Sequence, residues 1–434
     1  MRVPFPSFGQ PDRVQSRACA PLFHKPLRGA AQNALHRAMR ILIVTEALVL
    51  GGAETFVLRL ARQLRKDGHE AEILCLNPDF EDPRLVSQFP DVPINRVPVA
   101  GLRTIKRLDR IARAVGIDLD LQQRRSARWI EAHLIGRFDV HHTHLFGADQ
   151  LFARIKQQRP GLALVSTLHG DYALYEARSR GTERSRILHW RPKLTHVLRS
   201  DDRWVTISPA QHEQFTRLFG VDPAPLVDIP NGFAPPAPIP ALPPRADTAI
   251  RFVMVARGIR EKGWEYLVQA FGRLSGDVSL ALVGEGGFLE ELKAANCDPR
   301  IDFTGAHPNP AELIGQGDIF VHPSVYAAES MPTVIVEALY AGKPVIATAV
   351  GSVAGMIAIP AGKLAGTLVN PNTGTLVDEL AAAMQAYVDD PALRRAHAAL
   401  APAAFAKFDM EVCAAAYAAL YADVASSPPT RSSH

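Results

Sequence analysis

The stretch that decides the fold spans residues 318–350 and reads DIFVHPSVYAAESMPTVIVEALYAGKPVIATAV. Its apolar start predicts a strand, and a loop of small residues then leads to Glu329. Pro332 suits the first turn of a helix, because the N–H that proline lacks is not needed there. The helix ends near Gly342, and the apolar run at 345–347 predicts another strand. Strand, loop, helix and strand in this order indicate one unit of a parallel α/β sheet.

The start of that helix is a candidate phosphate site with a glutamate on either side of it. The first N–H groups of a helix have no internal partner and lie at the positive end of its dipole. Glu329 precedes the helix and can reach into a cleft. Glu337 is more than one turn inside, so its carboxylate must point back along the axis. Two acid/base groups or two hydroxyl-binding groups are open alternatives, but spacing alone favours a plain solvent-facing Glu337.

Length and composition indicate a globular protein of two domains. The chain has 434 residues, of which 47% are hydrophobic and 21% charged. It contains no run of ~18 or more apolar residues that would predict a membrane-spanning helix. Its four cysteines are scattered without metal-like spacing, which favours a reduced, cytoplasmic setting. The net charge is +4 overall and +5 in residues 1–38, hence −1 elsewhere, so the body has no bias towards nucleic acid.

Repeated strand and helix patterns divide the chain. Residues 41–44 predict a buried strand, followed by a glycine-containing loop, a helix and a second strand, an order that is Rossmann-like. The alternation resumes at residue 250, after seven prolines between Pro230 and Pro244 that predict a stiff linker. The expected divisions are a disordered or mis-called N-terminal extension (1–38), a Rossmann-like domain (39–232), the linker (233–247), a second Rossmann-like domain (248–407), a final helix (408–424) and a disordered tail (425–434).

The N-terminal extension has three interpretations. It contains five prolines and no clear periodicity, and Met39 stands directly before the first strand. We expect either a disordered tail or an over-called start with Met39 as the initiator, and an Arg-rich transit peptide is the alternative. A chain that starts at Met39 is expected to keep full activity.

Charged residues follow the first strand of the second half. Arg257 and Lys262 stand where the carboxyl end of that strand opens towards the cleft between the domains, which is where such sheets bind ligands. A guanidinium and an ammonium together neutralise a diphosphate without a metal. Solvent-exposed loop charges are the simpler alternative. The expected cleft loops contain no Asp-x-Asp, since Asp118 and Asp120 lie among basic helices of the first domain.

Histidines gather on a strand of the first half. Alternation along that strand places His142 and His144 on one face. His169, which follows a neighbouring strand, would be the third ligand of a metal site. Core or cleft-lining histidines are the favoured interpretation, and His169 is the best candidate for the cleft.

A basic amphipathic helix is expected at residues 102–115. Leu102, Ile105, Leu108, Ile111 and Val115 share one face, and arginines and a lysine occupy most of the other. The favoured interpretation is a helix whose apolar face packs on the core. Peripheral contact with anionic lipid, or with an anionic acceptor, is the alternative.

Taken together, these motifs resemble those of the retaining glycosyltransferases of family 4, which have the GT-B fold. The resemblance covers residues 39–424. Its most specific part is the pair Glu329 and Glu337, which matches the E-x7-E signature of the family. The other matching positions, in chain order, are Gly51, Gly52 and Glu54; Thr167 and His169; Asn231 and Gly232; Arg257, Lys262 and Gly263; and Gly284 and Gly286.

The resemblance implies an enzyme that transfers a hexosyl unit from a UDP- or GDP-linked sugar to a glycan or glycolipid acceptor. The first domain would bind the acceptor and the second the nucleotide sugar, and the final helix would cross back to the first domain. No cofactor or metal is expected, and retention would follow a same-face displacement. The implied catalytic residues are Glu329, which would hold the sugar hydroxyls, and His169, which would line the sugar site. The implied donor-binding residues are Arg257, Lys262, Gly51, Gly52, Ser330, Met331, Pro332 and Thr333 for the diphosphate, and Glu337 for the ribose.

Three departures from the family pattern leave the sugar open. Residues 351–355 carry no acid where the family has one, an acid is also missing within 370–373, and Ala256 replaces a common glycine. The rival interpretations are a non-catalytic protein that binds nucleotide sugars or glycans on the same fold, and an epimerase or phosphorylase of similar architecture.

Overall fold

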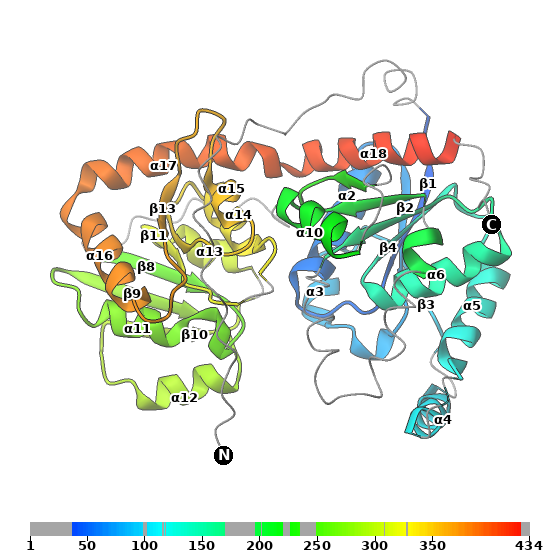
Figure 1. Cartoon of the computed structure of the whole chain (residues 1–434), viewed down its shortest axis with the longest axis horizontal. Coiled ribbons are helices and arrows are strands. Elements are labelled where there is room, and N and C mark those ends of the chain that lie inside the picture. Colours follow the sequence, from blue (N-terminus) through cyan, green and yellow to red (C-terminus); the bar gives the residue numbers. More distant parts are fainter. Residues whose placement is uncertain are drawn as a thin grey trace.

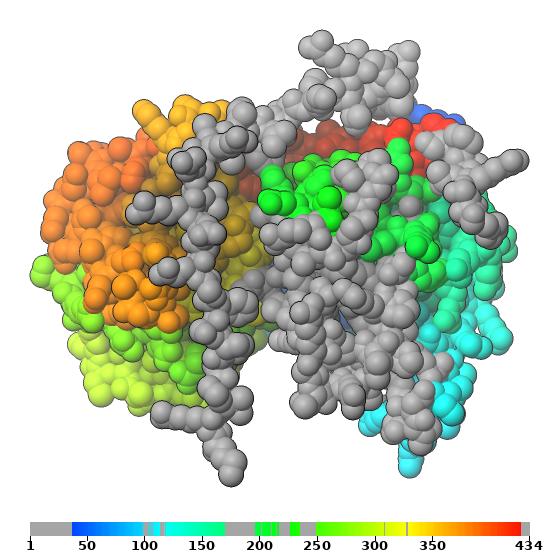
Figure 2. Space-filling model, viewed as in Figure 1, coloured from blue at the N-terminus to red at the C-terminus, as the bar shows by residue number. Residues whose placement is uncertain are grey.

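The structure is a computed structural model that describes residues 37–98, 102–114, 117, 119–169, 196–200, 202–219, 226–234, 249–307, 309–326 and 329–426. Two parallel sheets build it, each with helices on both faces (Figure 1). In the space-filling view, the described residues between 37 and 234 lie on one side and those between 249 and 408 on the other, whereas the last described stretch, 410–426, extends over the first side (Figure 2). This confirms the expected pair of Rossmann-like sheets.

The first sheet has seven strands in the order β3-β2-β1-β4-β5-β6-β7, and every neighbouring pair is parallel. Its central strands are buried along nearly their whole length because helices cover both faces. The strands are β1 (Arg40–Thr45), β2 (Glu70–Cys75), β3 (Ile94–Arg96), β4 (Val140–His144), β5 (Leu164–Leu168), β6 (Arg203–Thr206) and β7 (Leu226–Asp228). The described helices of this half are α2 (Gly52–Lys66), α3 (Pro83–Val86), α4 (Leu102–Ala114), α5 (Leu121–His133), α6 (Phe146–Gln158) and α10 (Pro209–Phe219).

The second sheet has six strands in the order β10-β9-β8-β11-β12-β13, again all parallel. The strands are β8 (Ile250–Val255), β9 (Val278–Val283), β10 (Ile301–Gly305), β11 (Ile319–His322), β12 (Val345–Thr348) and β13 (Gly366–Val369). The helices are α11 (Trp264–Phe271), α12 (Gly287–Ala295), α13 (Pro310–Gly315), α14 (Thr333–Tyr340), α15 (Val353–Ile357), α16 (Leu376–Asp389) and α17 (Pro391–Phe405). The stretch quoted at the outset forms β11, α14 and β12, as its pattern predicts.

The last helix, α18 (Met410–Ser426), lies against the first sheet although it follows the second in sequence (Figure 1). It packs on α2 and buries Tyr417 and Tyr421. The Tyr421 hydroxyl lies 2.6 Å from Nδ1 of His142, and the Tyr417 hydroxyl 2.9 Å from Oγ1 of Thr167. The helix therefore ties the second half of the chain to the histidine-bearing strands of the first.

The two segments of chain that lead from one half to the other lie side by side. Phe233, which precedes the second sheet, donates its backbone N–H to the carbonyl of Phe408 at 2.7 Å, just before α18. The Phe233 ring also packs against Tyr340 and Phe405 of the second half. We call Phe233 and Phe408 the crossover pair.

The expected core face of α4 is wrong. Leu108 is 47% exposed and Ile111 is 55% exposed, whereas Asp109 and Ala112 are buried. Two hydrogen bonds explain this orientation of α4: the Asp109 carboxylate accepts the backbone N–H groups of Leu121 and Gln122 at the start of α5, each at 3.0 Å. That role turns the Asp109 side of the helix inwards and the two apolar side chains outwards.

Several expectations fall on residues outside the described ranges. They concern most of the N-terminal extension (1–36), Val115 of the basic helix, most of the linker (235–247) and most of the tail (427–434). Among the helices that are described, none is both long enough and apolar enough to span a membrane.

Candidate active site

The loop before α14 is braced by the loop that follows β12. Gly351 has a φ of +53°, and a Cβ there would lie 1.8 Å from the carbonyl oxygen of Glu329, so only glycine fits. Beside it, the backbone N–H of Ser352 donates to the carbonyl of Ser330 at 3.1 Å. The backbone of Glu329 and Ser330 is thus fixed by contacts that the sequence pattern did not indicate.

The Glu329 carboxylate is held by three side chains of its own half. Its Oε2 lies 2.5 Å from Nζ of Lys262, 2.8 Å from the donating Oγ of Ser324 and 3.5 Å from Nε2 of His322. Burial by itself would raise the pKa of this carboxyl, but the contacts with His322 and Lys262 outweigh burial and lower the pKa to about 2. Glu329 is therefore an anion at neutral pH.

Lys262 reaches Glu329 from a short turn after β8. The 3₁₀ turn η2 (Arg260–Lys262) ends at Gly263, whose φ is +81°. A Cβ on Gly263 would lie 2.0 Å from the carbonyl oxygen of Pro323, so glycine is what lets the turn approach the Glu329 loop. The Lys262 side chain is only 10% exposed. An ammonium with one carboxylate partner keeps two further N–H donors for an anionic ligand.

Arg257 precedes that turn and is exposed. Its backbone carbonyl accepts the indole N–H of Trp264 at 2.9 Å, which fixes the loop. Its charge acts across to the first half of the molecule: burial raises the pKa of Glu54 on α2, and the charge of Arg257 opposes that rise. Arg257 therefore lies on the side of its half that faces α2.

The glycine pair of the first half meets the start of α14. Gly52 is the first residue of α2, and a Cβ on it would lie 3.3 Å from Oγ1 of Thr333. Gly51 immediately precedes it, with an extended backbone. The structure thus brings the N-termini of α2 and α14 together from opposite halves.

Glu337 has a different environment from Glu329. Its Oε1 lies 4.0 Å from Nη1 of Arg59, which belongs to α2 of the other half. Their side chains are 8% and 11% exposed. Burial raises the pKa of Glu337 and Arg59 opposes the rise, whereas burial lowers the pKa of Arg59. The solvent-facing interpretation of Glu337 is wrong, because α14 packs this side chain against α2.

The histidines form one buried cluster. Nδ1 of His144 lies 2.6 Å from Nε2 of His169, and the His142 and His144 ring centroids are 4.0 Å apart. Burial lowers the pKa of His169 to about 3 and that of the other two well below the ordinary value. The histidine rings are therefore neutral, and in the bond between His144 and His169 one ring donates an N–H to the other. In the described part of the chain, no group of three or more His, Cys, Asp or Glu is placed to hold a metal ion.

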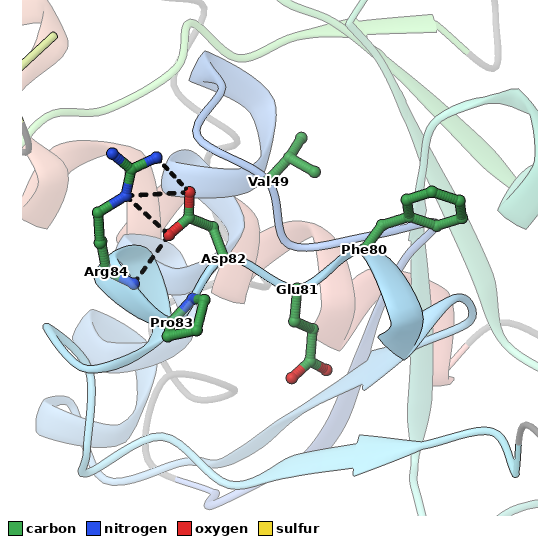
Figure 3. A pocket seen from close by; sticks show the side chains of 6 residues that line it. All are labelled: Val49, Phe80, Glu81, Asp82, Pro83 and Arg84. Carbon is green, nitrogen blue, oxygen red and sulfur yellow. Dashed lines mark hydrogen bonds and ion pairs between the residues drawn. The ribbon is translucent and has the colours of Figure 1, made fainter.

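A hollow of about 470 Å³ opens on the first half of the molecule (Figure 3). Phe80 is 58% exposed at its edge, and Val49 lies on the loop that leads to the glycine pair. Asp82 accepts the backbone N–H of Arg84 at 2.8 Å and pairs with its guanidinium. Pro83 and Glu81 complete the lining. The loops after β1 and β2 thus supply a partly apolar surface near the start of α2.

Sequence reasoning missed three of the residues that surround the glutamates. Ser324 and His322 bond or approach Glu329, and both stand inside the stretch quoted at the outset, so their nearness in sequence was an available signal. Arg59 approaches Glu337 from another half of the molecule. No sequence signal indicates that contact, since Arg59 is one of several arginines on α2.

Comparison with known proteins agrees with this geometry. A family model described as Glycosyltransferase Family 4 matches residues 50–235, and one described as Glycosyl transferases group 1 matches residues 249–390. A D-inositol 3-phosphate glycosyltransferase of Xylanimonas cellulosilytica is 28% identical over 88% of this chain and 94% of its own length. An MMP alpha-(1->4)-mannosyltransferase of Mycolicibacterium hassiacum is also 28% identical, over 79% of this chain and 87% of its own.

Solved structures show the same fold. HepE of Anabaena, in complex with UDP and glucose, superimposes with a TM-score of 0.64 at 19% identity, over 89% of this chain and 100% of that one. Two parallel Rossmann-like sheets with the paired glutamates at the start of α14 define a glycosyltransferase of the GT-B type. The two family models together span most of both halves, and the chain belongs to the family 4 glycosyltransferases, the retaining enzymes that use nucleotide sugars.

Proposed function

We propose that this enzyme transfers a hexosyl unit from a UDP- or GDP-linked sugar to a glycan or glycolipid acceptor, with retention and without a metal. The observation that carries the proposal is the buried pair of Lys262 and Glu329 at the start of α14. A cation for the diphosphate and a carboxylate for sugar hydroxyls thus stand side by side at one helix N-terminus.

The contacts of Glu329 support its role on the sugar. The three contacts with Lys262, Ser324 and His322 all fall on Oε2. The carboxylate is therefore oriented by one oxygen, and Oε1 accepts hydrogen bonds from the hydroxyl groups of the donor sugar. An acceptor fixed before the ligand arrives loses little entropy on binding.

The diphosphate lies between the two glutamates in this proposal. Lys262 and Arg257 neutralise it, together with the backbone at the start of α14, which follows Ser330, Met331 and Pro332 and begins at Thr333. Gly51 and Gly52 approach it from the other half, which the position of Gly52 beside Thr333 supports. Glu337 accepts hydrogen bonds from the ribose.

The transfer itself is a displacement on one face of the sugar. The bond from the anomeric carbon to the diphosphate breaks, the acceptor oxygen bonds to the same face, and the leaving phosphate takes the acceptor proton. Positioning and charge stabilisation supply most of the rate under this mechanism. His169, neutral because burial lowers its pKa, lines the sugar site as a hydrogen-bonding group.

A thermal-shift screen of UDP- and GDP-linked hexoses tests the donor. UDP-glucose comes first, because the Anabaena structure holds UDP and glucose, and a mannosyl donor second, because one relative is named a mannosyltransferase. A donor at 100 times its dissociation constant adds about 2.7 kcal/mol of stability. No shift with any member would contradict the proposal. Turnover that survives a chelator supports the metal-free mechanism, and turnover lost with the chelator and restored by Mg²⁺ contradicts it.

The acceptor side of the proposal includes a membrane contact through α4. This helix lies at the edge of the molecule (Figure 1), and it exposes Leu108 and Ile111 beside Arg107 and Arg110. Apolar and basic side chains together bind an anionic lipid surface from its aqueous side. The proposed location is therefore the cytoplasmic face of a membrane, where a lipid-linked acceptor is within reach.

Vesicle flotation tests this contact. The enzyme is expected to float with vesicles that contain phosphatidylglycerol and not with pure phosphatidylcholine, and Leu108→Ser with Ile111→Ser is expected to abolish flotation. The exposed Val412 on α18 offers a matched control, Val412→Ser, that should float like the wild type. Equal flotation of all three proteins would rule out α4 as the contact.

A further inference from the structure

Arg59 is the residue of the first half that approaches the nucleoside end of the proposed donor site. It lies on α2, two turns after Gly52, and its Nη1 is 4.0 Å from Oε1 of Glu337 on α14. Both side chains are nearly buried, at 11% and 8% exposure. A pair of this kind between two domains is costly unless both charges are well satisfied.

The two groups form an ion pair but no hydrogen bond with each other. A separation of 4.0 Å is too long for a hydrogen bond. Among the described residues, Nε of Arg59 and Oε2 of Glu337 are buried and have no hydrogen-bond partner. Leaving such atoms unpaired costs free energy, so a group that donates to Oε2 of Glu337 is favoured there. A ribose hydroxyl is such a donor.

Arg59 also rests on the crossover pair. Its guanidinium carbon lies 4.3 Å from the centre of the Phe233 ring, and the backbone N–H of Phe233 bonds to Phe408. The position of Arg59 is therefore linked to the place where the chain passes between the halves. A change in how the halves meet would move Arg59 relative to Glu337.

We propose that Arg59 is a positioning residue that keeps the Glu337 carboxylate aimed at the ribose of the donor, so that nucleoside recognition depends on the contact between the two halves. This inference rests on the proposed role of Glu337 as the ribose ligand. Arg59 itself does not touch the reacting atoms. It acts through Glu337, and its removal changes nucleoside discrimination rather than the chemical step.

A neighbouring arginine supplies the matched control. Arg62, one turn further along α2, lies 4.3 Å above the ring of Phe89 and pairs with Asp91 at 2.6 Å. Like Arg59, it contacts an aromatic ring and a carboxylate, and both of these partners belong to the first half. Arg62→Met removes an arginine from α2 without touching Glu337.

The experiment measures affinities of the full chain for UDP, GDP and their 2′-deoxy forms by titration calorimetry, using the base that the wild type binds more tightly. The wild type is expected to prefer the ribonucleotide by about tenfold, the loss that follows from one charge-assisted hydrogen bond. Arg59→Met is expected to reduce that ratio to about two or less, Arg59→Lys to restore part of it, and Arg62→Met to leave it unchanged. In steady state, Arg59→Met should raise the donor KM with little change in kcat.

The outcomes separate the two proposals. If the wild type binds neither nucleotide, or does not distinguish ribose from deoxyribose, the proposed role of Glu337 fails and the inference falls with it. If the wild type discriminates and Arg59→Met keeps the full ratio, Arg59 is only a structural ion-pair partner. If Arg59→Met does not fold, the inference is tested with Arg59→Lys and with the double variant Arg59→Lys/Glu337→Gln. Two substitutions that act through one contact are expected to have non-additive effects on the ribose preference. Additive losses in that double variant overturn the inference.

Discussion

The two glutamates that flank the start of α14 differ in what holds them. Glu329 takes Lys262 and Ser324 from its own half, at 2.5 and 2.8 Å, and its pKa is lowered to about 2. Among the described residues, the charged partner of Glu337 is Arg59 of the other half, at 4.0 Å, and burial raises the pKa of Glu337. The contacts given for Glu329 come from its own domain, whereas the environment of Glu337 depends on how the two domains meet. A repeat of the same residue type in one motif therefore does not imply one kind of chemistry.

The largest expected effect is that of Glu329→Gln. The amide keeps the shape but not the charge, so the sugar hydroxyls lose an anionic acceptor and buried Lys262 loses its partner. We expect kcat to fall by about a thousandfold with the fold intact. Release of nucleoside diphosphate in the presence of acceptor measures it. Glu290→Gln, at an exposed position of α12, is the control, and equal rates for both variants would remove Glu329 from the site.

Lys262→Ala should have the next largest effect, about a hundredfold on turnover, because the leaving diphosphate loses a buried cation. Arg260 stands in the same 3₁₀ turn but is 61% exposed and pairs with Glu265. Arg260→Ala is therefore a matched control, expected to stay within a few-fold of the wild type. Similar losses in both variants would mean that the turn as a whole matters, not the Lys262 charge.

Glu337→Gln is expected to act on binding. The donor KM should rise about tenfold while kcat changes little, because the ribose is remote from the reacting carbon. Initial rates over a range of donor concentrations separate the two constants. A large fall in kcat at an unchanged KM would place Glu337 at the chemical step and erase its difference from Glu329.

The smallest expected effect is in the pH dependence of stability, and its sign differs between the two residues. The folded pKa of Glu329 is lowered, so its contribution is present above the unfolded value of 4.5 and is lost as pH falls towards about 2. The folded pKa of Glu337 is raised, so its contribution is present below 4.5 and is lost as pH rises through the folded value.

Urea denaturation between about pH 3 and pH 6 measures both slopes. Relative to the wild type, Glu329→Gln should become less stable as pH rises, and Glu337→Gln should become more stable. Parallel stability curves for the wild type and both variants would mean that the two carboxylates share one environment.

Much of the fold was predictable because local patterns are repeated. Alternating apolar strands and amphipathic helices gave two parallel sheets, which the structure confirms. The assignment to family 4 glycosyltransferases is likewise confirmed by the two family models. The roles of Glu329, Glu337, Lys262 and His169 remain predictions, although the structure places the first three around the start of α14.

The expectations that were wrong concern which way a side chain faces. Periodicity alone placed Leu108 and Ile111 in the core, but Asp109 turns that face outwards by capping α5. Spacing alone placed Glu337 in solvent, but α2 covers it. In both cases a partner distant in sequence decides which way the side chain faces. Helical periodicity depends only on neighbouring residues and gives no information about such a partner.

The sequence by itself determined the strand order along the chain, the glycine turns and the E-x7-E motif, because each depends on residues that are close together in the chain. Only the tertiary structure decided that Arg59 meets Glu337, that α18 carries Tyr417 and Tyr421 to the histidine strands, and that α4 exposes an apolar face. These contacts join separate elements, and their existence depends on how whole sheets and helices pack, which no local spacing specifies.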